Sequence, residues 1–227
     1  MESMKRKKGS FIVIDGNDGS GKATQVRLLE RRLKKEWCKV SCVTYPDYKN
    51  NFFGGLISNY LHDSKYNWKN IHPEIASIVY ACDRWEGSSS IRRLLNDGYI
   101  ILSDRYASSN QIHQGGRISD NHERDNFISW LNTLEYEVFK IPKPDKIIYL
   151  DVPLSISQEL LRKRYSSGGK PDEYEKDPDF LRNSKITGDW LSETQENWER
   201  IDCAPNGALL SERKINDEIY NKIINFI

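Results

Sequence analysis

Short apolar runs alternate along the chain with longer stretches in which apolar residues recur every three or four positions. The short runs are rich in Ile, Val and Leu, which is typical of buried strands, whereas the recurring positions are typical of amphipathic helices. We predict strands at 11–14, 39–45, 99–103, 146–152 and 198–203. We predict helices at 24–35, 53–61, 73–95, 121–140, 154–164 and 177–198, followed by a last helix capped by Ser211. Gly188 weakens the prediction for 177–198, because glycine destabilises a helix interior.

This alternation of strands and helices predicts an α/β fold. The expected architecture is a parallel five-stranded sheet flanked by helices on both faces and joined by right-handed crossovers. At 227 residues the chain is long enough to build a sizeable core. We divide it into a basic tail, residues 1–8, and a single domain, residues 9–227. The domain includes a lid at about 162–176, where a glycine-rich break follows a basic cluster.

A glycine-rich segment between the first predicted strand and helix indicates a phosphate-binding loop of the P-loop type. The segment reads Gly16, Asn17, Asp18, Gly19, Ser20, Gly21, Lys22, Ala23 and Thr24. Glycines let the backbone N–H groups turn toward phosphate oxygens, the helix dipole adds partial positive charge, and Lys22 would reach the outer phosphates. Ala23 stands where this motif usually has Ser or Thr. The pattern alone is therefore incomplete, and an ordinary tight turn remains an alternative.

The composition of the chain mainly excludes classes of protein. The chain has 34 Lys and Arg against 33 Asp and Glu, a net charge of +1, which gives no global field for nucleic acid or an anionic membrane. Its apolar runs are all shorter than the roughly 20 residues of a membrane span. The four cysteines form no C-x-x-C pair and lie in or beside apolar segments. We therefore expect buried thiols in a reduced, cytoplasmic protein without structural zinc.

Charged residues lie at the ends of several predicted strands or in nearby segments. They are Lys22, Arg84, Asp104, Arg105 and the basic cluster 162–164. Ligands of open parallel sheets bind beyond the carboxyl ends of the strands, so these groups could converge on a polyphosphate. With Mg²⁺, such an arrangement would suit phosphoryl transfer. Each group also has a structural interpretation, as a surface ion pair or as a partner for a helix dipole.

Four motifs make the sequence similar to the thymidylate kinase family over nearly the whole chain: 16–22, 45–48, 80–84 and 104–115. The resemblance implies roles for individual residues in binding ATP and dTMP. Residues 16–24 would bind ATP. Asp18 would lie near the 3′-hydroxyl of thymidylate, and His113 beside its 2′ position. Tyr48 would lie near the acceptor phosphate, and Arg105 would lie on it. Tyr80 would lie against thymine, with Arg84 at a base carbonyl and Asn110 near the base. Gln114 continues the match. Asp47 departs from the arginine often found in the family.

Two departures from the family pattern bear on catalysis. Gly19 stands where some relatives have an arginine inside the phosphate loop. In the family pattern, members without that arginine carry the catalytic arginine in the lid instead. The resemblance therefore makes Arg162 and Arg164 the candidates. Ala23 lacks the hydroxyl that usually ligates magnesium, so we expect water or the phosphates to fill that position, with Asp104 as outer support.

The resemblance implies ATP-dependent transfer of the γ-phosphoryl group to dTMP, giving dTDP and ADP, within dTTP biosynthesis. Lys22, Asp18 and Arg105 would act in catalysis with the lid arginine. It also implies a homodimer that forms through helices such as 73–95. One alternative is a related nucleoside monophosphate or deoxynucleoside kinase, for which the acceptor is the discriminator. Another is a catalytically weakened nucleotide-binding protein, which the residue at position 23 favours.

Overall fold

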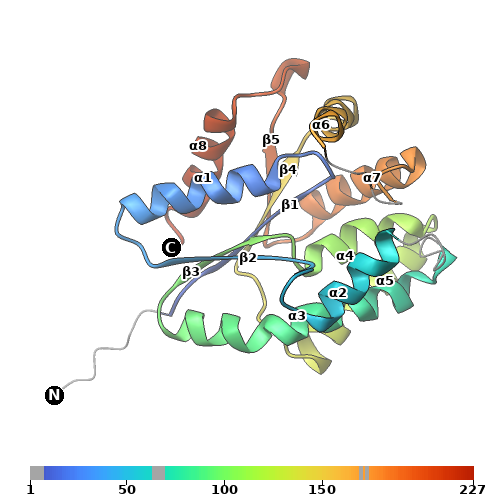
Figure 1. Cartoon of the computed structure of the whole chain (residues 1–227), viewed down its shortest axis with the longest axis horizontal. Coiled ribbons are helices and arrows are strands. Elements are labelled where there is room, and N and C mark those ends of the chain that lie inside the picture. Colours follow the sequence, from blue (N-terminus) through green and yellow to red (C-terminus); the bar gives the residue numbers. More distant parts are fainter. Residues whose placement is uncertain (1–7, 63–69, 169–170, 172–173) are drawn as a thin grey trace.

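The computed structural model describes residues 8–62, 70–168, 171 and 174–227. Its centre is a sheet of five parallel strands (Figure 1). In chain order these are β1 (Phe11–Gly16), β2 (Val40–Thr44), β3 (Ile100–Asp104), β4 (Lys146–Asp151) and β5 (Trp198–Asp202). Across the sheet the order is β2-β3-β1-β4-β5. The predicted fold class and all five predicted strands are confirmed, the strands to within two residues at each end.

Helices cover both faces of this sheet. The α-helices are α1 (Lys22–Lys35), α2 (Phe52–His62), α3 (Pro73–Asn96), α4 (Ala107–His113), α5 (Asn121–Asn132), α6 (Leu154–Ser166), α7 (Pro178–Thr194) and α8 (Glu212–Ile223). Short helical segments are also found among the described residues: η3 (Gly115–Arg117), η4 (Thr133–Val138) and η5 (Pro205–Gly207). Helices α1 and α8 pack together on one face, whereas α3, α4 and α7 lie on the other (Figure 1).

Strand β1 shows how the sequence builds two cores. Its side chains alternate between the faces of the sheet, as the pleat requires. Phe11 and Val13 join the cluster beneath α3, α4 and α7, while Ile12 and Ile14 join the cluster beneath α1 and α8. All four are fully buried. The run is therefore apolar without interruption, as expected for a central parallel strand, and it carries the phosphate loop at its carboxyl end.

The helix predicted at 121–140 differs from the structure in its second half. The α-helix ends at Asn132, and η4 continues as a π-helix. The wider π turn rotates the following side chains relative to an α-helix. Val138, an apolar residue near the end of the predicted helix, is consequently 63% exposed. Glu135, four residues after the buried Leu131, is fully buried.

Two further helices also differ from prediction. Helix α4 was not predicted at all. Helix α7 runs through Gly188 without a break and ends at Thr194, so the prediction that it reaches 198 was wrong at that end. The predicted cap at Ser211 is confirmed, because its hydroxyl accepts a hydrogen bond from the Lys214 N–H at 3.3 Å. Residues 1–7 of the predicted tail and 169, 170, 172 and 173 of the predicted lid lie outside the described residues.

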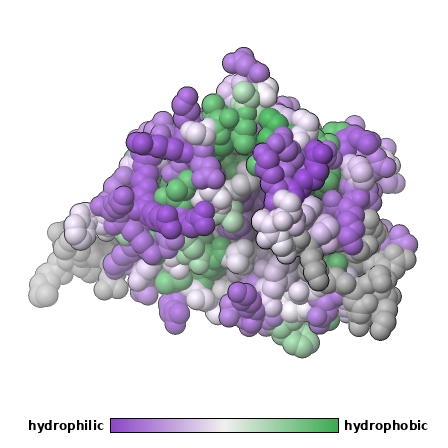
Figure 2. Space-filling model, turned by 45° about the horizontal axis from the view of Figure 1, so that its top comes forward, coloured by the Kyte–Doolittle hydropathy of each residue, from purple (hydrophilic) through white to green (hydrophobic). Residues whose placement is uncertain are grey.

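The surface seen in Figure 2 is mostly hydrophilic, with smaller hydrophobic areas between the polar side chains. Within the described ranges, no helix is both long and apolar enough to cross a membrane. All four cysteines are free thiols. The expectation that they are buried is correct only for Cys203. Cys38 and Cys82 are partly exposed, and Cys42 is exposed on β2, because that strand forms one edge of the sheet.

Candidate active site

The phosphate loop joins β1 to α1 and closes tightly on itself. Gly19 has φ +80°, and a Cβ there would lie 2.4 Å from the carbonyl oxygen of Ser157 in α6, so only glycine fits. The Lys22 ammonium donates to the carbonyl oxygens of Gly16 at 2.9 Å and Asn17 at 2.8 Å. Burial and the nearby Arg105 lower the pKa of Lys22 to about 8. Lys22 is thus held at the loop mouth by carbonyl oxygens that a phosphate could replace.

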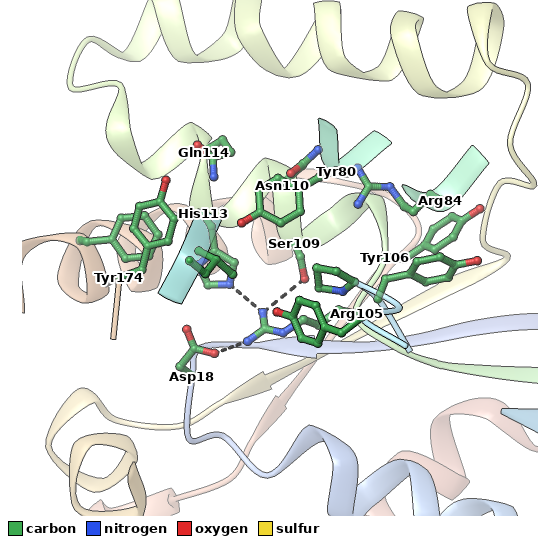
Figure 3. Close-up of a pocket in the computed structure, with 15 residues that line it drawn as sticks. Asp18, Tyr80, Arg84, Arg105, Tyr106, Ser109, Asn110, His113, Gln114 and Tyr174 are labelled. Carbon is green, nitrogen blue, oxygen red and sulfur yellow. Dashed lines mark hydrogen bonds and ion pairs between the residues drawn. The ribbon is translucent and has the colours of Figure 1, made fainter. Parts of the chain in front are cut away.

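Two cavities meet at this loop. The first is a groove along the phosphate loop, between α6 and the chain that enters α8. It is lined by residues 18–25, Asp104, Arg105, Leu160, Arg164, Leu209, Leu210, Glu212 and Ile215. The second is a pocket with aromatic walls (Figure 3). It is lined by Asp18, Tyr45, Pro46, Tyr48, Leu61, Tyr80, Arg84, Arg105, Tyr106, Ser109, Asn110, His113, Gln114, Tyr174 and Phe180. Asp18 and Arg105 line both cavities.

Arg105 is the hub of the boundary between the groove and the pocket. Its guanidinium forms an ion pair with Asp18 and donates to His113 Nε2 at 2.8 Å and to Ser109 Oγ at 3.4 Å (Figure 3). Burial alone would raise the pKa of Asp18, but Arg105 and then Lys22 hold it far below its usual range. Burial, together with Arg105, lowers the pKa of His113 to about 4. The site therefore presents a fixed anion, a fixed cation and a neutral imidazole.

A buried carboxylate that sequence analysis did not single out supports this hub. Asp15, at the end of β1, is fully buried and accepts hydrogen bonds from Ser108 Oγ at 2.5 Å and Ser109 Oγ at 2.9 Å. These bonds join the strand before the phosphate loop to the first turn of α4. The signal was present in the sequence, since an aspartate ends an otherwise apolar strand next to the loop glycines.

Two carboxylates of α3 hold the loop that carries Tyr48. Asp83 accepts from the Asp47 N–H at 3.0 Å and from the side-chain amide of Asn51 at 2.8 Å. Glu86 accepts from the backbone N–H groups at the start of α2 at 2.9 and 3.1 Å, and thereby caps that helix. The chain after β2 is thus tied to α3, and Tyr48 is kept at the pocket rim with 45% of its surface exposed.

The inner wall of the pocket combines aromatic rings with buried polar groups. Tyr80 and Tyr106 line it, and Tyr106 is fully buried. Arg84 lines it as well, but its guanidinium is paired with Glu135 of η4. Asn110 donates to the Ser77 carbonyl at 3.2 Å and to Glu135 at 3.3 Å. Gln114, also buried, accepts from Arg117 at 2.7 Å.

The two candidate lid arginines occupy different environments. Arg164 lines the groove beside the phosphate loop and forms an ion pair with Glu175, which also accepts from Tyr165 Oη at 2.8 Å. Arg162 lies on the outer surface of α6, beside Glu159 and Lys163. The structure therefore brings Arg164, but not Arg162, to the loop.

Asp104 ends β3 opposite the phosphate loop. Its Oδ1 atom is buried and has no hydrogen-bond partner among the described residues. Burial raises the pKa of this carboxyl, against the opposing effect of Lys22 and Arg105. In the part of the chain that the structure describes, no three His, Cys, Asp or Glu side chains form a cluster that could hold a metal ion. A cation here would therefore need ligands from a bound phosphate or from water.

Comparisons with known proteins point to one family. The family model described as thymidylate kinase matches residues 14–215. Thymidylate kinase from Plasmodium falciparum is 32% identical over 154 residues, which are 67% of this chain and 66% of that protein. Thymidylate kinase from Prochlorococcus marinus is 32% identical over 228 residues, 97% of this chain and 98% of that one. A solved structure of thymidylate kinase from Candida albicans has a similar fold, with TM-score 0.74 and 24% identity, covering 96% and 92% of the two chains.

Proposed function

The chain belongs to the thymidylate kinase family, and from this premise we propose that it transfers the γ-phosphoryl group of ATP to dTMP, giving dTDP and ADP. One observation carries the assignment to this site: the groove on the phosphate loop and the aromatic pocket share Asp18 and Arg105. ATP binds in the groove through residues 16–24. Deoxythymidylate binds in the pocket, so its phosphate meets the donor at the shared boundary.

Arg105 holds the acceptor phosphate in this proposal. Asp18 keeps the Arg105 guanidinium at the boundary between the groove and the pocket, and it also contacts the sugar near the 3′-hydroxyl. Tyr80 stacks on the thymine ring, and Arg84 and Asn110 face the polar edge of the base. Tyr48 closes the pocket on the phosphate side, whereas His113 and Gln114 close it on the sugar side. The neutral ring of His113 leaves no room beside the 2′ position for a ribose hydroxyl.

Lys22 and the loop N–H groups bind the donor phosphates and neutralise part of their charge. Mg²⁺ fits beside them, since the buried Oδ1 of Asp104 lacks a partner among the described residues and Mg²⁺ prefers oxygen ligands and retained waters. When bound, the ion supplies further charge neutralisation on the transferred group. Asp104 supports it as an outer ligand, because Ala23 offers no hydroxyl. Arg164, rather than Arg162, is the lid arginine that stabilises the transferred phosphoryl group.

We also propose that the enzyme is a homodimer and works in the cytoplasm. Helix α3 carries an apolar stripe of Ile75, Ile78, Cys82 and Trp85, spaced so that all four lie on one side of the helix. Ile75 is 54% exposed and Trp85 53%, which leaves this stripe open to a second copy of the chain. The reducing cytoplasm suits the four free thiols.

The test is ADP release from ATP and Mg²⁺ with dTMP, dUMP, UMP, thymidine or no acceptor. We expect dTMP to give the strongest release, Arg105→Ala to abolish it, and the surface variant Arg93→Ala to preserve it. Equal release with thymidine would favour a nucleoside kinase, which has no acceptor phosphate for Arg105 to bind. ATP binding without acceptor-stimulated release would overturn the kinase assignment and favour a nucleotide-binding protein that has lost turnover.

A further inference from the structure

Glu135 is a fully buried carboxylate in the middle of the molecule. It lies in η4 and continues the apolar side of α5, where Phe127 and Leu131 are also buried. Leu131 and Glu135 are four residues apart, which is the spacing of neighbours along one face of a helix. A charged residue therefore occupies a position that packing alone would give to leucine, and a buried carboxylate is costly unless it is paired.

The carboxylate of Glu135 is paired with two polar residues of the acceptor pocket. One oxygen accepts from Arg84 Nε at 2.7 Å, and the other pairs with Arg84 Nη2. Asn110 Nδ2 also donates to Glu135, at 3.3 Å. Such a two-point contact fixes both the position and the plane of a guanidinium, which a single contact does not. Glu135 thus joins α3 and α4 through one carboxylate.

The ion pair leaves one end of the Arg84 guanidinium available. The pair uses Nε and Nη2, and no hydrogen bond from Nη1 to another described residue is present. Arg84 is only 2% exposed, yet it lines the same pocket as Tyr80 and Asn110 (Figure 3). A donor held rigidly at the wall of an aromatic pocket suits a flat ring that carries carbonyl oxygens on its edge.

We propose that Glu135 is a positioning residue for recognition of the acceptor's pyrimidine base: it holds Arg84 in the orientation that presents the free end of its guanidinium to a ring carbonyl, and it fixes Asn110 beside it. The inference rests on the proposed function of this pocket. Arginine without such a partner has many rotamers, and ordering it on binding would cost free energy. A neutral residue at 135 would also leave the buried guanidinium without its counter-charge.

The experiment is a double-mutant cycle with Arg84→Gln, Glu135→Gln and the double variant. We expect Glu135→Gln to raise the KM for dTMP by about 10- to 100-fold, the effect of a misplaced binding group, and to leave the KM for ATP within about twofold of the original. Glu137→Gln, an exposed acid two residues away in the same segment, is the matched control and should change neither value. In the Arg84→Gln background, Glu135→Gln should change kcat/KM for dTMP by less than about threefold, because the group it orients is gone.

Independent, multiplicative effects of the two substitutions would overturn the proposal, as would an equal rise in both KM values, which a merely structural role would produce. If Glu135→Gln does not fold, Glu135→Asp keeps the charge but withdraws it by one methylene, and the same KM criteria apply.

Calorimetric titration of the unmodified protein with dTMP separates the function proposed for the pocket from the role proposed for Glu135. Absence of dTMP binding would overturn the function proposed for the pocket, whereas dTMP binding with a multiplicative cycle would overturn only the role of Glu135.

Discussion

Arg105 donates from Nη1 to the Nε2 atom of His113 at 2.8 Å. Because a guanidinium is always a donor, Nε2 of the imidazole must be an acceptor, and the ring proton lies on Nδ1. Nδ1 is 3.1 Å from Ser184 Oγ, which can accept that proton. Phe180 stacks on the ring, with 5.7 Å between the ring centroids. The surroundings thus select one neutral tautomer and oppose the charged form.

This arrangement makes stability depend on pH. Burial and Arg105 lower the pKa of His113 to about 4 in the folded protein, against 6.5 for the free side chain, despite the opposing Asp18 and Asp15; Lys22 adds to the lowering. Between these values the unfolded chain binds a proton that the folded protein does not, so the free energy of unfolding falls as pH falls from 6.5 to 4. The loss should approach about 3 kcal/mol. Urea unfolding at pH 7, 5.5 and 4.5 measures it.

The control for this effect is His122→Gln, at an exposed position on α5. His113→Gln should flatten the pH dependence between 6.5 and 4, whereas His122→Gln should leave it unchanged. Equal slopes for the unmodified protein and His113→Gln would contradict the prediction.

The lid arginines form a matched pair of substitutions. Arg164→Ala should lower kcat by about a thousandfold or more, because an arginine that stabilises the transferred phosphoryl group typically contributes that much. Arg162→Ala should leave kcat within about twofold, since this side chain lies on the outer surface of α6. Steady-state rates with saturating ATP and dTMP make the comparison. A loss confined to Arg162→Ala would reverse the assignment.

Ala23→Ser should strengthen the response to magnesium. Position 23 is exposed at the start of α1 and lines the groove, so a hydroxyl fits without displacing its neighbours. One added ligand contact is worth about 1 kcal/mol, so the Mg²⁺ concentration for half-maximal rate should fall roughly fivefold. Ala23→Cys has nearly the same shape but a poor magnesium ligand, and it should not change that concentration. An unchanged response in Ala23→Ser would remove the basis for outer support by Asp104.

Much of the fold could be predicted from sequence because its signals are local. Four apolar residues at 11–14 specify a central strand, and the glycines at 16, 19 and 21 specify the loop that follows. The π turn in η4 has no comparable signal: an α-helical and a π-helical continuation of α5 use the same residues and differ only by one extra residue in a turn. Helix α4 is too short and too polar for its apolar spacing to be visible.

The candidate site likewise contains residues that could be predicted from sequence and residues that could not. Sequence identified the residues at the carboxyl ends of strands, and the structure brings Lys22, Asp104 and Arg105 together around the phosphate loop. Residues that bond to the site from distant parts of the sequence could not be predicted. Glu135 lies 51 positions from Arg84, and Asp15 lies 94 positions from Ser109. The choice between Arg162 and Arg164 depends on which side of α6 faces the groove, and two basic residues separated by one position give no such information.

Gly188 provides a test of packing between α7 and the sheet. A Cβ at this position would lie 2.6 Å from Tyr149 Oη and 2.7 Å from a ring carbon of the same fully buried side chain. Gly188→Ala should therefore reduce the free energy of unfolding by about 1–3 kcal/mol, although alanine favours helices. Gly55→Ala in α2 is the control, because a Cβ there meets no atom within 4 Å among the described residues, apart from its chain neighbours and the nearby backbone of its own helix. That variant should gain about 0.5–1 kcal/mol. Equal effects at both positions would show that Tyr149 can move aside.

The exposed stripe on α3 makes the proposed homodimer testable with one substitution. Trp85 is 53% exposed and shares its side of the helix with Ile75, Ile78 and Cys82. Trp85→Glu would introduce a charge at an apolar contact and remove an aromatic side chain of the kind that dominates interfaces. We expect the dimer dissociation constant to rise about 30-fold or more, the equivalent of about 2 kcal/mol.

Trp37→Glu is the control: Trp37 is 95% exposed at the end of α1, on the opposite face of the sheet. Sedimentation equilibrium should find a dimer for the unmodified protein and for Trp37→Glu, and mostly monomer for Trp85→Glu. A monomer in all three, or a Trp85→Glu dimer of unchanged affinity, would exclude this stripe as the contact between subunits.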